Sequence, residues 1–242
     1  MVRTFKSFKK FNVTIIVNSN INIDIKGIDK VNIIELNNYQ LLPLTCRKTI
    51  WESRNVYDIF IYSENDHLFL EHHLDKHIEY SNLLPNKYLP GLLQYEELNG
   101  EKYYPAYHKN FDWEIKSVVK FEDKIFAHFN NVHQASFVLT KNQLKRVSNK
   151  INFCSLKKYN RLEHSFYRIF KKDKLKKKYS DKCKVNTDIY EFGGMKKVIC
   201  ISEFDDNLIH HLPNVYINGE KGRKKLRSKQ DKMDSVLKKM LS

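Results

Sequence analysis

Alternating apolar and polar segments predict strands that alternate with helices over the first eighty or so residues. Short apolar runs rich in β-branched or aromatic side chains predict buried strands at residues 12–17 (NVTIIV), 30–36 (KVNIIEL) and 57–62 (YDIFIY). Helices are expected over residues 44–54, with Thr45 as a candidate N-cap, and over 68–81. This alternation predicts an α/β fold with a mostly parallel sheet.

The rest of the chain predicts a further mixture of elements. Strands are expected over residues 115–121, 124–129, 135–139, 197–202 and 207–211. A helix is expected over 141–149, and the strongly basic residues 156–184 also favour a helix. Residues 219–242 form a basic tail, expected to be a helix or partly disordered.

Composition limits the class of protein but does not select a partner. Of the 242 residues, 41% are hydrophobic, which is typical of a globular chain. The formal charge of +15 suits nucleic acid, anionic lipid or phosphorylated substrates equally well. The four cysteines form no CxxC pair, and no segment has the length of a membrane helix or the features of a signal peptide. We therefore expect a cytoplasmic protein, with peripheral membrane association as an alternative.

The first candidate for chemistry is an acidic turn that follows the strand predicted at residues 57–62. Glu64 and Asp66 are separated by one residue, so both carboxylates can reach one cation. Hard oxygen ligands suit Mg²⁺ or Mn²⁺. The alternative is an acidic turn that only faces solvent.

Four segments together resemble motifs of GT-A-type glycosyltransferases. The segment YDIFIYSENDH is similar to the apolar strand and DxD signature of that family. Three more follow in the same order: KYLPGLLQYE at 87–96, NNVHQASFVLTKNQL at 130–144 and IHHLPNVYI at 209–217. The chain departs from the family pattern at Asn65 and at Gln94, where an acidic residue and an arginine are expected.

The resemblance implies a GT-A-like mixed, mostly parallel sheet flanked by helices. Only eleven residues precede the first predicted strand, so we expect either that the chain is a fragment of a longer frame or that the family manages without its N-terminal strand and helix. Residues 1–155 would then form the core that binds nucleotide-sugar and metal. Residues 156–218 would complete that domain on the acceptor side, and 219–242 would be a basic tail.

The implied activity is metal-dependent transfer of a sugar from a nucleotide-sugar to a glycan, glycolipid or other lipid-linked acceptor. A UDP-linked donor is favoured, and the cofactor would be Mn²⁺ or Mg²⁺. The metal would bind Asp66 and Glu64, assisted by His211 or His210. Adjacent strand residues point to opposite faces, so only one of the two histidines can face the metal, and we favour His211.

The resemblance also yields candidates for donor binding and catalysis. The donor-binding candidates are Arg47, Thr45, Glu64 and Asn65. An inverting enzyme needs a general base for the acceptor hydroxyl, and the candidates are Glu163, Asp112 and Glu96. A retaining enzyme needs no such base, and each of these residues has a purely structural role as its alternative.

Two other functions are kept as alternatives. The basic runs at 157–184 and 219–239 interleave with aromatic residues, as in nucleic-acid-binding proteins, but no known nucleic-acid-binding motif accompanies them. They also suit docking on an anionic membrane surface. An inactive GT-A-like protein is the second alternative. His73 and His77 lie four residues apart, but without a third ligand they predict only a solvated helix face.

Overall fold

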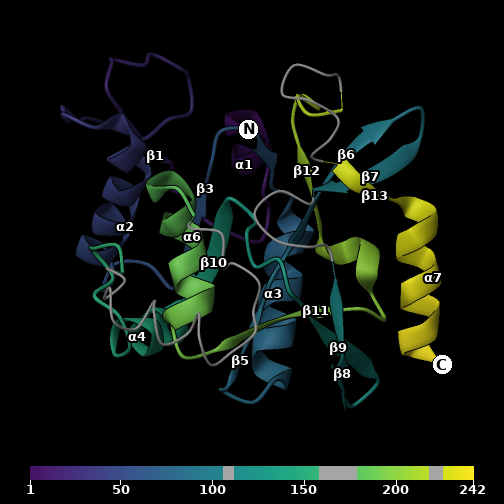
Figure 1. Ribbon diagram of the computed structural model, residues 1–242. Coiled ribbons are helices and arrows are strands. Elements are labelled where there is room, and N and C mark those ends of the chain that lie inside the picture. Colours follow the sequence, from purple (N-terminus) through teal and green to yellow (C-terminus); the bar gives the residue numbers. More distant parts are fainter. Residues whose placement is uncertain (106–111, 158–178, 218–225) are drawn as a thin grey trace, which may run out of the picture.

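The computed structural model describes the chain except for residues 106–111, 158–178 and 218–225. Its strands form four small sheets (Figure 1). Two sheets are pairs, β1 (Ile16–Ser19) with β2 (Lys30–Ile33), and β10 (Ser136–Thr140) with β3 (Ile59–Ser63). A third has the order β5 (Tyr88–Pro90), β11 (Lys196–Cys200), β9 (Lys124–Phe129) and β8 (Trp113–Phe121). The fourth has the order β13 (Leu226–Lys229), β7 (Glu101–Pro105), β6 (Leu93–Leu98), β12 (Leu208–His211) and β4 (His67–Leu68).

The prediction of one GT-A-like, mostly parallel sheet is therefore wrong. Only three of the nine strand pairings described are parallel, and β3, the strand before the acidic turn, pairs antiparallel with β10. Short turns explain much of the difference. Asn99 and Gly100 join β6 to β7 with positive φ angles, as in the two-residue turns that return a strand antiparallel to its neighbour. Glu122, also at positive φ, turns β8 into β9.

Helices are distributed on opposite sides of these sheets. Figure 1 shows α2, α4 and α6 toward one side and α7 at the other, beside the C-terminus. The helices and 3₁₀ turns are α1 (Val2–Lys6), η1 (Tyr39–Leu41), α2 (Leu42–Glu52), α3 (Glu71–Leu83), α4 (Lys141–Ser148), α6 (Asp181–Phe192), η2 (Phe204–Asn207) and α7 (Gln230–Leu241). No helix of the described chain is both long enough and apolar enough to cross a membrane.

Local capping explains where several helices begin. Thr140 accepts a hydrogen bond from the backbone of Gln143, whose side chain accepts from the backbone of Thr140, so the pair forms a capping box for α4. Ser180 caps α6 through the backbone N–H of Cys183. In α3 the Nδ1 atom of His73 accepts from the backbone N–H of Leu70.

Two of the apolar clusters divide the core between the sheets. One joins β3 and β10 to α2, α4 and α6, and includes Phe60, Phe137, Leu139, Leu144, Val185 and Ile189. Another joins β6 to β9 and α7, and includes Leu93, Tyr104, Trp113, Phe129, Met233 and Leu237. The helix at the end of the chain thus contributes to the core with one face.

Candidate metal centre

Asp66 lies where three strands meet. Two of them, β3 and β4, are close in sequence, and the third, β12, comes much later in the chain. β3 ends at Ser63, the acidic turn follows, and β4 begins at His67. β4 pairs antiparallel with β12, so that His67 lies opposite His211. The backbone N–H of Leu212 donates to the carbonyl oxygen of Asp66 at 2.6 Å. This pairing holds the acidic turn against the end of β12.

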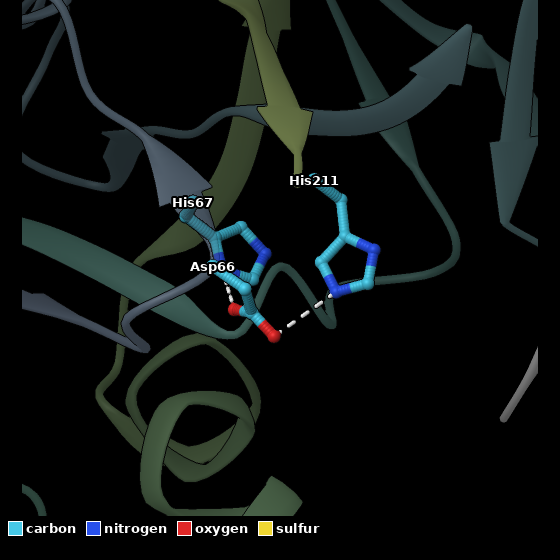
Figure 2. Close-up of side chains that lie close together, drawn as sticks. All are labelled: Asp66, His67 and His211. Atoms are coloured by element: carbon cyan, nitrogen blue, oxygen red, sulfur yellow. Dashed lines mark hydrogen bonds and ion pairs between the residues drawn. The ribbon is translucent and has the colours of Figure 1, made fainter. Parts of the chain in front are cut away.

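Three side chains meet at this junction (Figure 2). The Oδ2 atom of Asp66 lies 3.3 Å from Nε2 of His211, and its Oδ1 atom lies 2.7 Å from Nδ1 of His67. One potential ligand atom from each residue lies within 4.8 Å of the other two. The His67 and His211 side chains are buried, whereas that of Asp66 is 34% exposed. The group is therefore closed on the imidazole side and open to solvent at the carboxylate.

The contact between Asp66 and His67 is not a hydrogen bond. Oδ1 of Asp66 and Nδ1 of His67 are both buried, and neither has a hydrogen-bond partner, although they lie 2.7 Å apart. The ring nitrogen and the oxygen thus contact each other as an ion pair without the alignment of a hydrogen bond. Ligand atoms of a shared cation lie beside one another in this way.

The outer ring nitrogens of both imidazoles contact side chains of β6. Nδ1 of His211 donates to Oε1 of Glu96 at 2.6 Å, and Nε2 of His67 contacts the side-chain amide of Gln94. Gln94 and Glu96 are alternate residues of one strand, so they point to the same face. Glu96 also accepts hydrogen bonds from the backbone N–H groups of Tyr216 and Ile217, the latter at 2.8 Å. Such partners fix the orientation of a metal-binding imidazole.

The electrostatics of the site favour positive charge beside the carboxylates. Burial alone would lower the pKa of His211, but hydrogen bonds to Asp66 and Glu96 outweigh it and raise the pKa to about 9. Burial would raise the pKa of Asp66, but the contacts with His211 and His67 outweigh it and hold the pKa well below its usual range. Either a protonated imidazole or a bound metal ion would supply the positive charge that these carboxylates favour.

The structure separates the other predicted metal ligands from this group. Glu64 forms an ion pair with Lys182 at 2.8 Å, and Asn65 is exposed. His210 stacks on the ring of Tyr95 and bonds Oδ1 of Asn214 at 2.8 Å. Of the two adjacent histidines, His211 is the one that lies beside Asp66, as strand alternation predicts; its role as a metal ligand stays a prediction.

The donor-binding residues predicted on α2 are engaged in the interior. Arg47 is fully buried, donates to the backbone oxygen of Asn152 at 3.3 Å and lies over the ring of Phe153. Burial lowers the pKa of Arg47 to about 10. Thr45 is no N-cap, because the helix begins at Leu42, whose carbonyl oxygen accepts from the Thr45 hydroxyl. Arg47 is therefore closed to solvent in this structure, and its contact with a diphosphate stays a prediction.

The candidate general bases have three different outcomes. Glu96 is buried and held by His211 and two backbone donors, so it positions an imidazole and has no free access to an acceptor hydroxyl. Asp112 is exposed just before β8, in a different sheet from β4 and β12. Glu163 lies outside the described residues.

Sequence reasoning missed His67 and Gln94. His67 directly follows the acidic turn, and this position is the signal in the sequence that could have indicated it. The prediction for that helix was also wrong. His73 and His77 are buried rather than solvated, and each bonds inside the protein, to the backbone oxygen of Leu208 and to Gln143.

The comparisons with known proteins add no assignment. No family model matches the sequence, and the searches of curated proteins and of solved structures each found no match. The assignment of a function therefore depends on the residues of this site.

Proposed function

We propose that this chain is a metal-dependent glycosyltransferase that moves a sugar from a nucleotide-sugar, UDP-linked in preference to others, to a glycan or lipid-linked acceptor. The observation that carries the proposal is the 3.3 Å approach of His211 Nε2 to Asp66 Oδ2 at the end of β12. The carboxylate suits Mn²⁺ or Mg²⁺, and an imidazole that is held by a second carboxylate can complete the coordination of a divalent transition metal such as Mn²⁺.

The convergence of the four transferase-like segments supports the proposal. The strand of the first segment, β3, pairs with the strand of the third, β10, and the backbone N–H of Glu64 donates to Ala135. The second and fourth segments pair through β6 and β12. Gln134 accepts from the backbone N–H of Leu92 at 3.0 Å and so joins the third segment to the second. Segments that are far apart in sequence are therefore joined to one another in the fold.

Each residue of the site would have a distinct task. A divalent cation bound there would stabilise the negative charge that develops on the diphosphate leaving group. Asp66 has an exposed side to receive the cation. Glu96 holds the Nδ1–H of His211, which leaves the lone pair of Nε2 free for coordination. Lys182, half exposed beside Glu64, would add positive charge near the diphosphate.

The proposal is tested by thermal-shift and nucleotide-release measurements with UDP- and GDP-sugars, with and without Mn²⁺. A ligand that binds the native state raises its apparent stability. We expect stabilisation and release of nucleoside diphosphate for one donor, only with metal, and loss of both in D66N. D205N is the matched control, because Asp205 is a highly exposed carboxylate that pairs with Lys102.

Two results would count against the proposal. The first is an unchanged response in D66N. The second is that no donor binds while single-stranded nucleic acid binds with sub-micromolar affinity and a steep dependence on salt. The second result would favour the nucleic-acid-binding alternative.

A further inference from the structure

We propose that His67 is a third ligand of the metal, through Nδ1, and that the site therefore selects a transition-metal ion over Mg²⁺. This inference rests on the metal centre of the proposed function and specifies which ion that centre takes. It adds an imidazole that the sequence motifs did not indicate.

The burial of His67 is the first argument. The imidazole is almost fully buried, and its Nδ1 atom makes no hydrogen bond. Oδ1 of Asp66, 2.7 Å away, is buried and equally without a hydrogen bond. The two atoms contact each other as an ion pair, but each lacks the hydrogen bond that a buried polar atom normally makes. A cation between them would satisfy both atoms at once.

The spacing of the three ligand atoms is the second argument. The atoms from Asp66, His67 and His211 lie within 4.8 Å of one another. Ligands at about 2.1 Å from one ion are separated by roughly 3.0 Å when adjacent and 4.2 Å when opposite. Movements of a few tenths of an ångström, within reach of side-chain rotations, bring the observed group to these values.

The partner of the other ring nitrogen is the third argument. When Nδ1 binds a metal, Nε2 of His67 carries the proton and needs an acceptor. That nitrogen contacts the side-chain amide of Gln94, which is buried. An amide presents either its nitrogen or its oxygen by a half-turn, so Gln94 can accept this proton in the metal-bound state. Gln94 then serves His67 as Glu96 serves His211.

Two imidazoles and one carboxylate define the class of ion. Mg²⁺ prefers oxygen ligands and keeps several of its waters, whereas imidazole suits first-row transition metals such as Fe²⁺, Ni²⁺, Cu²⁺ and Zn²⁺. Affinity for nitrogen sites rises along the series from Mn²⁺ to Co²⁺. The exposed side of Asp66 leaves positions for a substrate diphosphate or water.

Metal titration without any donor tests the inference. Calorimetry would compare Mn²⁺, Co²⁺ and Mg²⁺ on the wild type, H67Q and H210Q. His210 is the matched control, because it neighbours His211 but stacks on Tyr95 instead of facing Asp66. We expect the wild type and H210Q to prefer Co²⁺ and Mn²⁺ to Mg²⁺ by about 100-fold or more, and H67Q to lose about tenfold or more of that preference.

Pulsed electron paramagnetic resonance of bound Mn²⁺ counts the coordinated imidazoles directly. Two are expected in the wild type and one in H67Q, with circular dichroism confirming that the variant is folded. One imidazole in the wild type, or Mg²⁺ affinity within about tenfold of Mn²⁺, would overturn the inference.

The outcome is separable from that of the proposed function. Two imidazoles on Mn²⁺ without release of nucleotide from any donor would support the inference and reject the transferase. Donor release with one imidazole on the metal would reject His67 alone. Unchanged metal binding in D66N would reject both.

Discussion

The Nε2 atom of His211 lies 3.3 Å from the Oδ2 atom of Asp66, although 145 residues separate the two in the sequence. The pairing of β4 with β12 brings them together, and the hydrogen bond from Leu212 to the carbonyl of Asp66 fixes the register. The side-chain relationship thus depends on backbone pairing rather than on a flexible loop. Substitutions in and around this part of the fold test the account.

Glu96→Gln tests how His211 is held. The Glu96 carboxylate accepts from His211 and from two backbone N–H groups, and an amide satisfies fewer of these donors. We expect E96Q to lose about 1–3 kcal/mol of unfolding free energy and about tenfold or more in metal affinity. Urea denaturation and metal titration measure the two effects.

Glu97→Gln is the matched control for this change. Glu97 is the next residue of the same strand and its side chain is exposed. We expect E97Q to change the unfolding free energy by less than about 0.5 kcal/mol. Equal losses in E96Q and E97Q would show that the contacts of Glu96 contribute nothing specific.

Lys197 makes stability depend on pH in the alkaline range. Burial lowers the pKa of this lysine from its usual 10.5 to about 7 in the folded protein. Between these values the unfolded chain binds more protons than the folded chain, so stability rises with pH from about 7 to 10.5 and is flat below. The slope approaches about 1.4 kcal/mol per pH unit for one proton.

The slope is obtained by measuring the difference in unfolding free energy between the wild type and K197M at several pH values. We expect that difference to shift in favour of the wild type as the pH rises through this window. K196M is the control, because Lys196 is the exposed neighbour that pairs with Glu114. The same slope for K196M would contradict the assignment to the buried lysine.

Gly91→Ala tests the packing around the same lysine. A Cβ atom at position 91 would lie 2.6 Å from Cγ and 2.9 Å from Cδ of Lys197, which is closer than carbon atoms pack. Because Lys197 is fully buried and cannot move aside freely, we expect G91A to lose about 1–3 kcal/mol of unfolding free energy. A double-mutant cycle with K197A measures the coupling, and strictly additive losses would reject the clash.

His77 makes stability depend on pH in the acid range. Burial lowers its pKa from 6.5 to about 4, and a hydrogen bond to Gln143 opposes this only in part. The folded protein therefore resists protonation of this imidazole, and stability is lost as the pH falls from 6.5 to about 4. We expect the unfolding free energy of H77Q to fall less steeply than that of the wild type over this range, by up to about 1.4 kcal/mol per pH unit. H72Q, on the same helix but partly exposed, is the control, and an equal effect there would contradict the prediction.

Local sequence patterns predicted many elements but not how the strands pair. The apolar run at 57–62 covers all of β3 except Ser63, and the segment at 141–149 contains all of α4. Parallel order was inferred from the early alternation of strands and helices. The turns at Asn99-Gly100 and Glu122, which impose antiparallel neighbours, lie later in the chain than the alternation that favours parallel order.

The candidate site was predictable in part for a similar reason. Alternation along the strand predicted that only one of His210 and His211 would lie beside Asp66, and spacing in the acidic turn indicated Asp66. The place of His67 depends on its pairing opposite His211, which no local pattern encodes. The burial of Arg47 depends on Asn152 and Phe153, which lie about a hundred residues further along the chain.

The measurement that tests the central claim most directly is a crystal structure with Mn²⁺ and UDP, using anomalous scattering to locate the metal. The account predicts one manganese peak at about 2.2 Å from the Asp66 carboxylate and from His211 Nε2, with the diphosphate of UDP on its open side. Clear manganese density elsewhere, with Asp66 and His211 still in direct contact, would contradict it.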